Sequence, residues 1–286
     1  MVVGYFMTAS HTETGGLHAF LQKISDDARS VDVTWQRLFP AVQKPGPKPE
    51  RSTGVPTPSP TFAQPVSASQ GMTGDKLIQA MKHRLKEYHR HSQLDVILLE
   101  DDADCRFNTS GSTAEHEGEA FIEFEARLQQ EVSAELGREI PVVALLASPE
   151  VETWLLADWE RSFQADYPSL SFALSRHLVE RLGGGGTPDA PERFGGPCLN
   201  GSCSHKLSDT LAAAFRVTQE DDAALFSALE ALRASGHRAT YSKRIEGPAM
   251  LGRVRPEVVA KRCTLYFRPA YQRLLRLLAV SSQPPT

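Results

Sequence analysis

The chain has 286 residues, of which 41% are hydrophobic and 23% are charged, and its formal net charge is −4. This length supports one large α/β domain or two small ones and excludes a mini-protein, while the mild acidity excludes a global basic field, so nucleic-acid binding requires local patches. Because no apolar run approaches the roughly 18 residues of a membrane span and residues 1–6 have no basic start, we expect a cytoplasmic protein outside the membrane.

The first 40 residues predict a strand, a helix and a second strand. Residues 2–7 form a short apolar run typical of a buried strand, and apolar residues in the range 17–24 recur at helical spacing. Val31, Val33 and Trp35 alternate with polar residues, which predicts a second strand that ends at Pro40.

Residues 40–72 interrupt this pattern with a proline-rich insertion. Eight prolines from Pro40 to Pro65 are mixed with Lys, Ser, Thr and Gly, and large apolar residues are almost absent. Such a segment cannot bury enough surface to offset its ordering entropy, so we predict an exposed, disordered insertion. A ligand for a proline-recognition domain is the alternative.

A helix with one apolar and one basic face is predicted to begin near Thr73 or Asp75. Its outer face is the most basic surface in the sequence, with Lys82, Lys86 and Arg90. This face either is simply solvated or contacts the phosphates of a nucleic acid.

The aliphatic run Leu94–Leu99 leads directly into Glu100, Asp101, Asp102 and Asp104. This pattern predicts a buried parallel strand that delivers acidic residues at its carboxyl end, where open α/β sheets bind ligands. In an extended segment the side chains of Asp102 and Asp104 point the same way, so both could hold one hard cation such as magnesium. The alternative is an acidic loop that only aids solubility.

A helix closed by Gly137 and a buried strand over residues 140–147 follow. Ser148 is expected to cap the next helix, with Pro149 at its first position. Acids in a first turn also complement the helix dipole without any catalytic role, and helical spacing would place Glu150 and Glu152 on different faces.

These elements predict an α/β fold with a mostly parallel sheet flanked by helices. We assign this core to residues 1–160 and a mainly helical C-terminal region, packed on it, to residues 161–286. Four scattered cysteines predict no disulfide framework. Cys198 and Cys203 stand near His205, but their spacing matches no common zinc pattern, so we favour incidental thiols over a zinc site.

Two blocks of the sequence resemble motifs of a TOPRIM-like, Rossmann-like bacterial family known as domain of unknown function 4276. They are VILLEDDAD at 96–104 and PEVETWLLAD at 149–158, which are similar to its acidic-strand and Glu-x-Glu-x-Trp-x-x-Ala-Asp motifs. Thr12-Glu13 stands where that family has Glu-Gly-x-Thr-Glu/Asp, and residues 241–267 are similar to its closing motif.

The resemblance implies a magnesium-dependent or manganese-dependent nuclease that acts on DNA or RNA in a bacterial anti-phage defence system, beside an ATPase partner. It implies metal binding by Asp102, Asp104 and Glu150. The catalytic set it implies is Glu13, Asp102, Asp104, Glu150 and Glu152. Phosphate contacts are expected from Lys82, Lys86, Arg90, Lys206 and Lys243.

One departure from the family pattern bears on activity. Ala9-Ser10 stands where the family has its first Glu-Gly, so the general acid/base is missing unless Glu13 or Glu100 substitutes. The chain is then expected to cleave slowly or not at all. The alternatives are a catalytically silent interaction subunit of an ATPase-containing complex and a metal-dependent glycosyltransferase. The sequence also allows a homo-oligomer.

Overall fold

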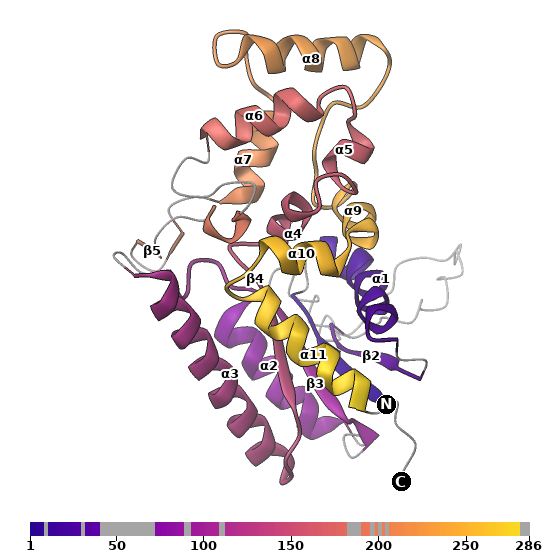
Figure 1. The fold of residues 1–286 in the computed structure, drawn as a ribbon, viewed down its shortest axis with the longest axis vertical. Coiled ribbons are helices and arrows are strands. Elements are labelled where there is room, and N and C mark those ends of the chain that lie inside the picture. Colours follow the sequence, from indigo (N-terminus) through magenta and orange to yellow (C-terminus); the bar gives the residue numbers. More distant parts are fainter. Residues whose placement is uncertain are drawn as a thin grey trace, which may run out of the picture.

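The computed structural model describes residues 1–8, 11–29, 32–40, 72–88, 93–108, 112–181, 190–194, 198–199, 202–203 and 206–280. Its centre is a parallel sheet whose strands run in the order β2-β1-β3-β4 (Figure 1). The strands are β1 (Val2–Phe6), β2 (Thr34–Phe39), β3 (Val96–Asp102) and β4 (Val142–Ala147). This sheet confirms the predicted α/β fold. The predicted disorder of the insertion falls on residues 41–71, which lie outside the described part.

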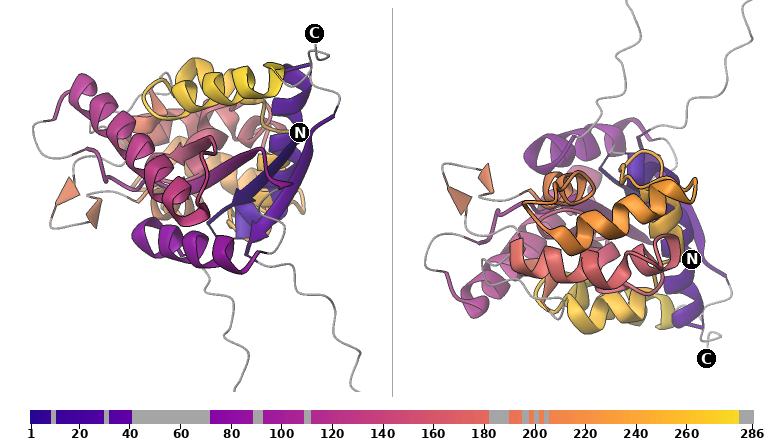
Figure 2. Two further views of the ribbon diagram at one scale, coloured as in Figure 1. Left: turned by 90° about the horizontal axis from the view of Figure 1, so that it is seen from below. Right: turned by 90° about the horizontal axis from the view of Figure 1, so that it is seen from above.

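Helices cover both faces of the sheet, as the continuous burial of β3 and β4 requires. Helices α2 (Gly74–Glu87) and α3 (Ala114–Leu136) pack together on one face, and α1 (His11–Asp27) and α11 (Phe267–Val280) lie on the other (Figure 2). The apolar face predicted for α2 is confirmed, because Leu77, Ile78, Met81 and Leu85 are all buried. Gly137 ends α3 in the left-handed conformation, as the sequence predicts.

The strand order creates a switch point between β1 and β3. The chain leaves β1 through α1 towards β2 on one side, whereas β3 and β4 continue the sheet on the other. In open α/β sheets, ligands bind at such a switch point, outside the carboxyl ends of the strands. The backbone amide of Thr8, just after β1, donates to Glu100 O at 3.2 Å and so joins the carboxyl ends of the two strands.

The rest of the chain is mainly helical, as predicted, and α6, α7 and α8 lie beyond the carboxyl end of the sheet in Figure 1. No helix in the described ranges is long and apolar enough to cross a membrane. These remaining elements are α4 (Glu152–Ala157), α5 (Phe163–Asp166), α6 (Ser171–Arg181), η2 (Pro191–Arg193), β5 (Cys198–Leu199), β6 (Ser202–Cys203), α7 (Leu207–Ala214), α8 (Ala223–Ala234), α9 (Gly247–Arg253) and α10 (Pro256–Arg262).

The predicted start of the helix after β4 is wrong. Ser148 does not cap it, and α4 begins at Glu152. The Ser148 hydroxyl instead donates to the carbonyls of Asp104 and Glu192, each at 3.3 Å, and the Pro149 carbonyl accepts from the Asp104 amide at 2.8 Å. These long-range bonds hold residues 148–149 outside the helix, so Glu150 lies before α4 and not on it.

Glycines let α1 and α9 approach closely. A Cβ on Gly16 would lie 2.6 Å from Pro248 O and 2.7 Å from Leu251 Cβ, which is closer than packed atoms allow. A Cβ on Gly247 would collide with the Thr12 side chain. This contact fixes the position of the first turn of α1 relative to the start of α9.

Gly16→Ala is therefore expected to destabilise the fold by about 1–3 kcal/mol, because the added methyl group meets backbone and Cβ atoms that cannot rotate away. Urea denaturation measures the change. Gly118→Ala is the matched control: nothing lies within 4 Å of a Cβ there in α3, so helix propensity should stabilise that variant by up to about 1 kcal/mol. Equal shifts for both variants would contradict the close approach.

Candidate metal centre

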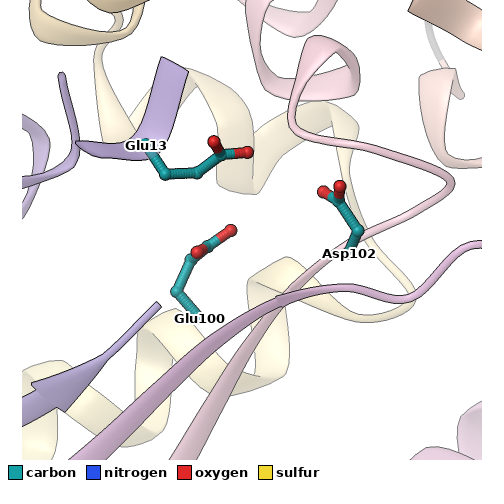
Figure 3. Close-up of side chains that lie close together, drawn as sticks. All are labelled: Glu13, Glu100 and Asp102. Atoms are coloured by element: carbon teal, nitrogen blue, oxygen red, sulfur yellow. The ribbon is translucent and has the colours of Figure 1, made fainter. Parts of the chain in front are cut away.

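Three carboxylates converge at the switch point between β1 and β3. Glu13 comes from the first turn of α1, and Glu100 and Asp102 come from the end of β3. One oxygen of each lies within 4.8 Å of the others, and Figure 3 shows the three side chains pointing toward one another. Glu13 and Glu100 are fully buried and Asp102 is 7% exposed. We call these residues the acidic triad.

The acidic triad has oxygens without hydrogen-bond donors. Both carboxylate oxygens of Glu13 and Oε1 of Glu100 are buried and accept no hydrogen bond within the described structure. The other Glu100 oxygen accepts from the Thr8 amide at 3.0 Å, and Oδ1 of Asp102 accepts from the Val151 amide at 3.0 Å. Glu100 and Asp102 are therefore each held by one backbone amide, and Glu13 and Glu100 keep buried acceptor atoms that a cation could use.

Burial disfavours the charged form of all three groups. Burial raises the pKa of Glu13 to about 8, and the Glu152 carboxylate contributes to the rise. Burial, followed by the nearby Glu13 carboxylate, also raises the pKa of both Glu100 and Asp102. Clustered buried acids with strongly shifted pKa values are characteristic of functional sites. A hard cation with oxygen ligands would relieve both the repulsion and the missing bonds.

A second group of charges adjoins the acidic triad. Lys243 Nζ lies 3.0 Å from Glu152 Oε2 and 3.4 Å from Glu150 Oε2. The Tyr241 hydroxyl donates to Glu152 Oε1 at 3.0 Å, and the Ser208 amide donates to Glu150 Oε2 at 2.9 Å. The predicted separation of Glu150 and Glu152 onto different helix faces is wrong, because Glu150 precedes α4 and both acids reach one lysine.

Asp104 is placed differently from its prediction. Strand β3 ends at Asp102, and Asp104 has a φ of +48°, so the extended geometry assumed for Asp102-x-Asp104 is absent. Asp104 is exposed and does not belong to the acidic triad, and neither does Glu150. Lys206 is exposed at the start of α7 and is close enough to Asp104 to interact with it electrostatically. Both lie near the site rather than in the triad.

The residue that sequence reasoning undervalued is Glu100, which it considered only as a substitute acid. The missed signal is the two-residue period of a strand. Once β3 is extended to Asp102, Glu100 and Asp102 share one face, and Asp101 faces the other way. Asp101 there accepts from Arg106 Nη2 at 2.9 Å and from the Gly74 amide at the start of α2 at 3.0 Å.

The basic face of α2 is partly neutralised by α3. Lys82 Nζ lies 3.2 Å from Glu131, and Lys86 Nζ lies 2.6 Å from Glu135. The isolated basic patch predicted from the sequence is therefore weaker than expected. Arg90, His205 and the side chain of Cys198 lie outside the described residues, so the Arg90 contact and the preference for incidental thiols over a zinc site stay predictions.

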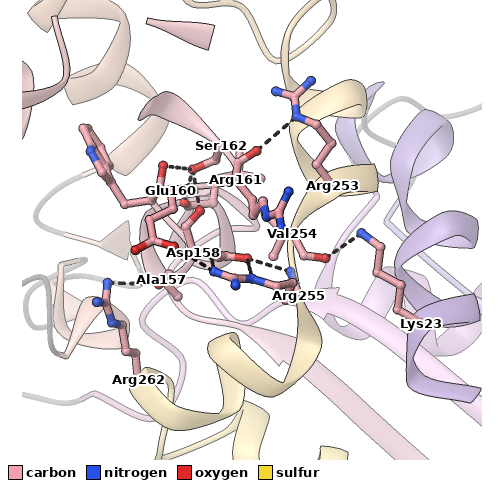
Figure 4. Close-up of polar contacts among 12 residues, drawn as sticks. Lys23, Ala157, Asp158, Glu160, Arg161, Ser162, Arg253, Val254, Arg255 and Arg262 are labelled. Atoms are coloured by element: carbon pink, nitrogen blue, oxygen red, sulfur yellow. Dashed lines mark hydrogen bonds and ion pairs between the residues drawn. The ribbon is translucent and has the colours of Figure 1, made fainter. Parts of the chain in front are cut away.

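Asp158, the last residue of the 149–158 block, has a structural role (Figure 4). Its carboxylate is buried and accepts from the Arg255 backbone amide at 2.9 Å, from Nε at 2.9 Å and from Nη2 at 2.7 Å. Nη2 of Arg255 also donates to the exposed Glu160 at 3.2 Å. Asp158 thus ties the end of α4 to the start of α10 and does not reach the acidic triad.

Comparison of the chain with protein-family models, with curated proteins and with solved structures gives no match. The family resemblance of the motifs therefore stays a prediction, and the acidic triad is interpreted from its own geometry.

Glu13→Gln is expected to stabilise the protein without added metal by about 1–3 kcal/mol, because it removes a buried carboxylate that has no donor. The same change should abolish any rise in melting temperature caused by magnesium or manganese, which the unmodified chain should show by mass action. Thermal scans with and without metal measure both effects. Glu123→Gln, at an exposed position of α3, is the matched control and should change neither. A destabilised Glu13→Gln protein that keeps its metal response would contradict the site.

Asp158→Ala should lower the free energy of unfolding by about 2 kcal/mol. Removing one partner of a fully buried ion pair would cost more, but Arg255 is about one-third exposed and can reach water. Glu160→Ala removes the other partner of Arg255, a carboxylate that is 74% exposed. This variant should change the free energy of unfolding by less than about 0.5 kcal/mol. Urea denaturation measures both. Metal-induced stabilisation should persist in both variants; its loss in Asp158→Ala would move Asp158 into the metal site.

Proposed function

We propose that the chain is a TOPRIM-like, magnesium-dependent hydrolase of nucleic-acid phosphodiesters. One observation carries this proposal: Glu13, Glu100 and Asp102 meet, buried and incompletely hydrogen-bonded, at the carboxyl ends of β1 and β3. Parallel α/β sheets bind their ligands at this position. Three carboxylates match the oxygen ligands of magnesium or manganese better than those of softer metals.

The residues of the site have different proposed roles. Glu13, Glu100 and Asp102 would hold the cation, which when bound supplies charge stabilisation for a phosphate group and lowers the pKa of water. Lys243, whose side chain is 28% exposed, would face the substrate phosphate, and Lys206 would contact a flanking phosphate. Glu13 would replace the first Glu of the family pattern. This chain has Ala9 at that position, which lies outside the described residues.

The cellular context is proposed on the motifs alone. A cytoplasmic anti-phage nuclease, acting on DNA or RNA beside an ATPase partner, agrees with the motif resemblance of residues 96–104 and 149–158. The same motifs are compatible with a monomer and with a homo-oligomer.

Magnesium-dependent cleavage of plasmid DNA, single-stranded DNA or RNA tests the proposal, with a sugar nucleotide as a fourth substrate. The unmodified chain should cut at least one nucleic acid, and chelation of the metal should stop the reaction. Asp102→Asn should reduce the rate by about a hundredfold or more, because it removes a cation ligand of the acidic triad. Asp104→Asn is the matched control and should keep the rate within about tenfold, because its carboxylate lies outside the triad.

Three outcomes would contradict the proposal. Equal cleavage by Asp102→Asn and the unmodified chain would place the activity elsewhere. Turnover of the sugar nucleotide alone would favour a glycosyltransferase. Metal binding without turnover of any substrate would favour the silent interaction subunit.

A further inference from the structure

We propose that this centre takes one divalent cation, and that the ammonium group of Lys243 occupies the place of a second. The inference deepens the proposed function, on which it rests. It follows from an unequal distribution of hydrogen bonds and ion pairs among five carboxylates that lie close enough to influence one another: Glu13, Glu100, Asp102, Glu150 and Glu152.

The five acids fall into two sets with opposite bonding. In the acidic triad, Glu13 has no donor on either oxygen and Glu100 has none on Oε1. In the other set, Oε1 of Glu152 accepts from the Tyr241 hydroxyl. Oε2 of Glu152 accepts no hydrogen bond in the described structure but forms an ion pair with Lys243 Nζ at 3.0 Å. Glu150 Oε2 is bonded by the Ser208 amide and lies 3.4 Å from Lys243 Nζ. Among these five acids, the buried oxygens with neither a hydrogen bond nor an ion pair in the described structure therefore belong to the triad.

Lys243 is anchored as an internal part of the site rather than as a mobile surface lysine. Its carbonyl accepts from the Thr12 hydroxyl at 3.0 Å, next in sequence to Glu13. The following turn is closed on itself, because the amides of Ile245, Glu246 and Gly247 all point to the Ser242 carbonyl at 3.0–3.3 Å. Gly247 lacks the Cβ that would collide with Thr12. The backbone therefore delivers the ammonium group to a fixed point between Glu150 and Glu152.

This arrangement makes a second divalent cation unfavourable. A cation bridging Glu150 and Glu152 would have to displace an ammonium group that already contacts both, or remain beside it against like-charge repulsion. A two-metal centre needs ions about 3.5–4 Å apart with carboxylates available to both. The chain instead supplies one fixed positive charge beside the triad, which would be available to a substrate phosphate.

The number of Mn²⁺ ions bound per chain, measured by equilibrium dialysis and by calorimetry on the full chain, tests the inference. The unmodified chain should bind one. Lys243→Met should bind two, because it frees Glu150 and Glu152 without adding a donor. Lys206→Met is the matched control: this exposed lysine lies near the site without an ion pair to either glutamate in the described structure, so binding should stay at one.

Glu152→Gln gives a second measurement that does not require Lys243→Met to fold. It should leave one Mn²⁺ bound with affinity changed less than about tenfold, because Glu152 is a partner of Lys243 and not a ligand. Two ions on the unmodified chain, one ion on a folded Lys243→Met protein, or loss of binding in Glu152→Gln would each overturn the inference. Two ions on the unmodified chain would leave the proposed function standing, whereas no binding at all would overturn both.

Discussion

The electrostatic constraint behind the site is the burial of several carboxylates close together at the carboxyl ends of β1 and β3. A buried carboxylate without a partner raises the free energy of the folded chain, so the structure must offer donors or cations at the same point. Backbone amides supply part of this: Thr8 donates to Glu100, Val151 to Asp102 and Ser208 to Glu150. These three donors come from three distant segments, which the switch-point topology brings to one edge of the sheet.

The contact between α1 and α9 sets how the two halves of the site meet. Thr12 donates to the Lys243 carbonyl and fits against Gly247, and the next residue, Glu13, enters the acidic triad. A shift of α1 along α9 would therefore move the unpartnered carboxylates and the ammonium group relative to each other. The glycines at the contact therefore influence the relative positions of the charged side chains as well as the packing of the two helices.

Sequence periodicity was enough to predict the sheet and its helices, because an unbroken run such as Leu94–Leu99 has few structural alternatives. It also found the acids at the end of β3. It could not show that Glu13 would converge with them, because that depends on how α1 packs on α9. Nor could it place Glu150 outside α4, since the bonds that hold residues 148–149 come from Asp104 and Glu192. The pairing of Lys82 and Lys86 with α3 is equally long-range.

An acidic motif is therefore not a functional unit in this chain. The two-residue period of β3 divides one acidic run, so that Glu100 and Asp102 enter the site while Asp101 bonds to Arg106 and to the start of α2. The block at 149–158 divides similarly, since Glu152 meets Lys243 whereas Asp158 holds Arg255. What separates the groups is whether a buried carboxylate oxygen has a hydrogen bond or an ion pair within the protein. The proposal of one bound cation rests on that difference rather than on the count of acids in a motif.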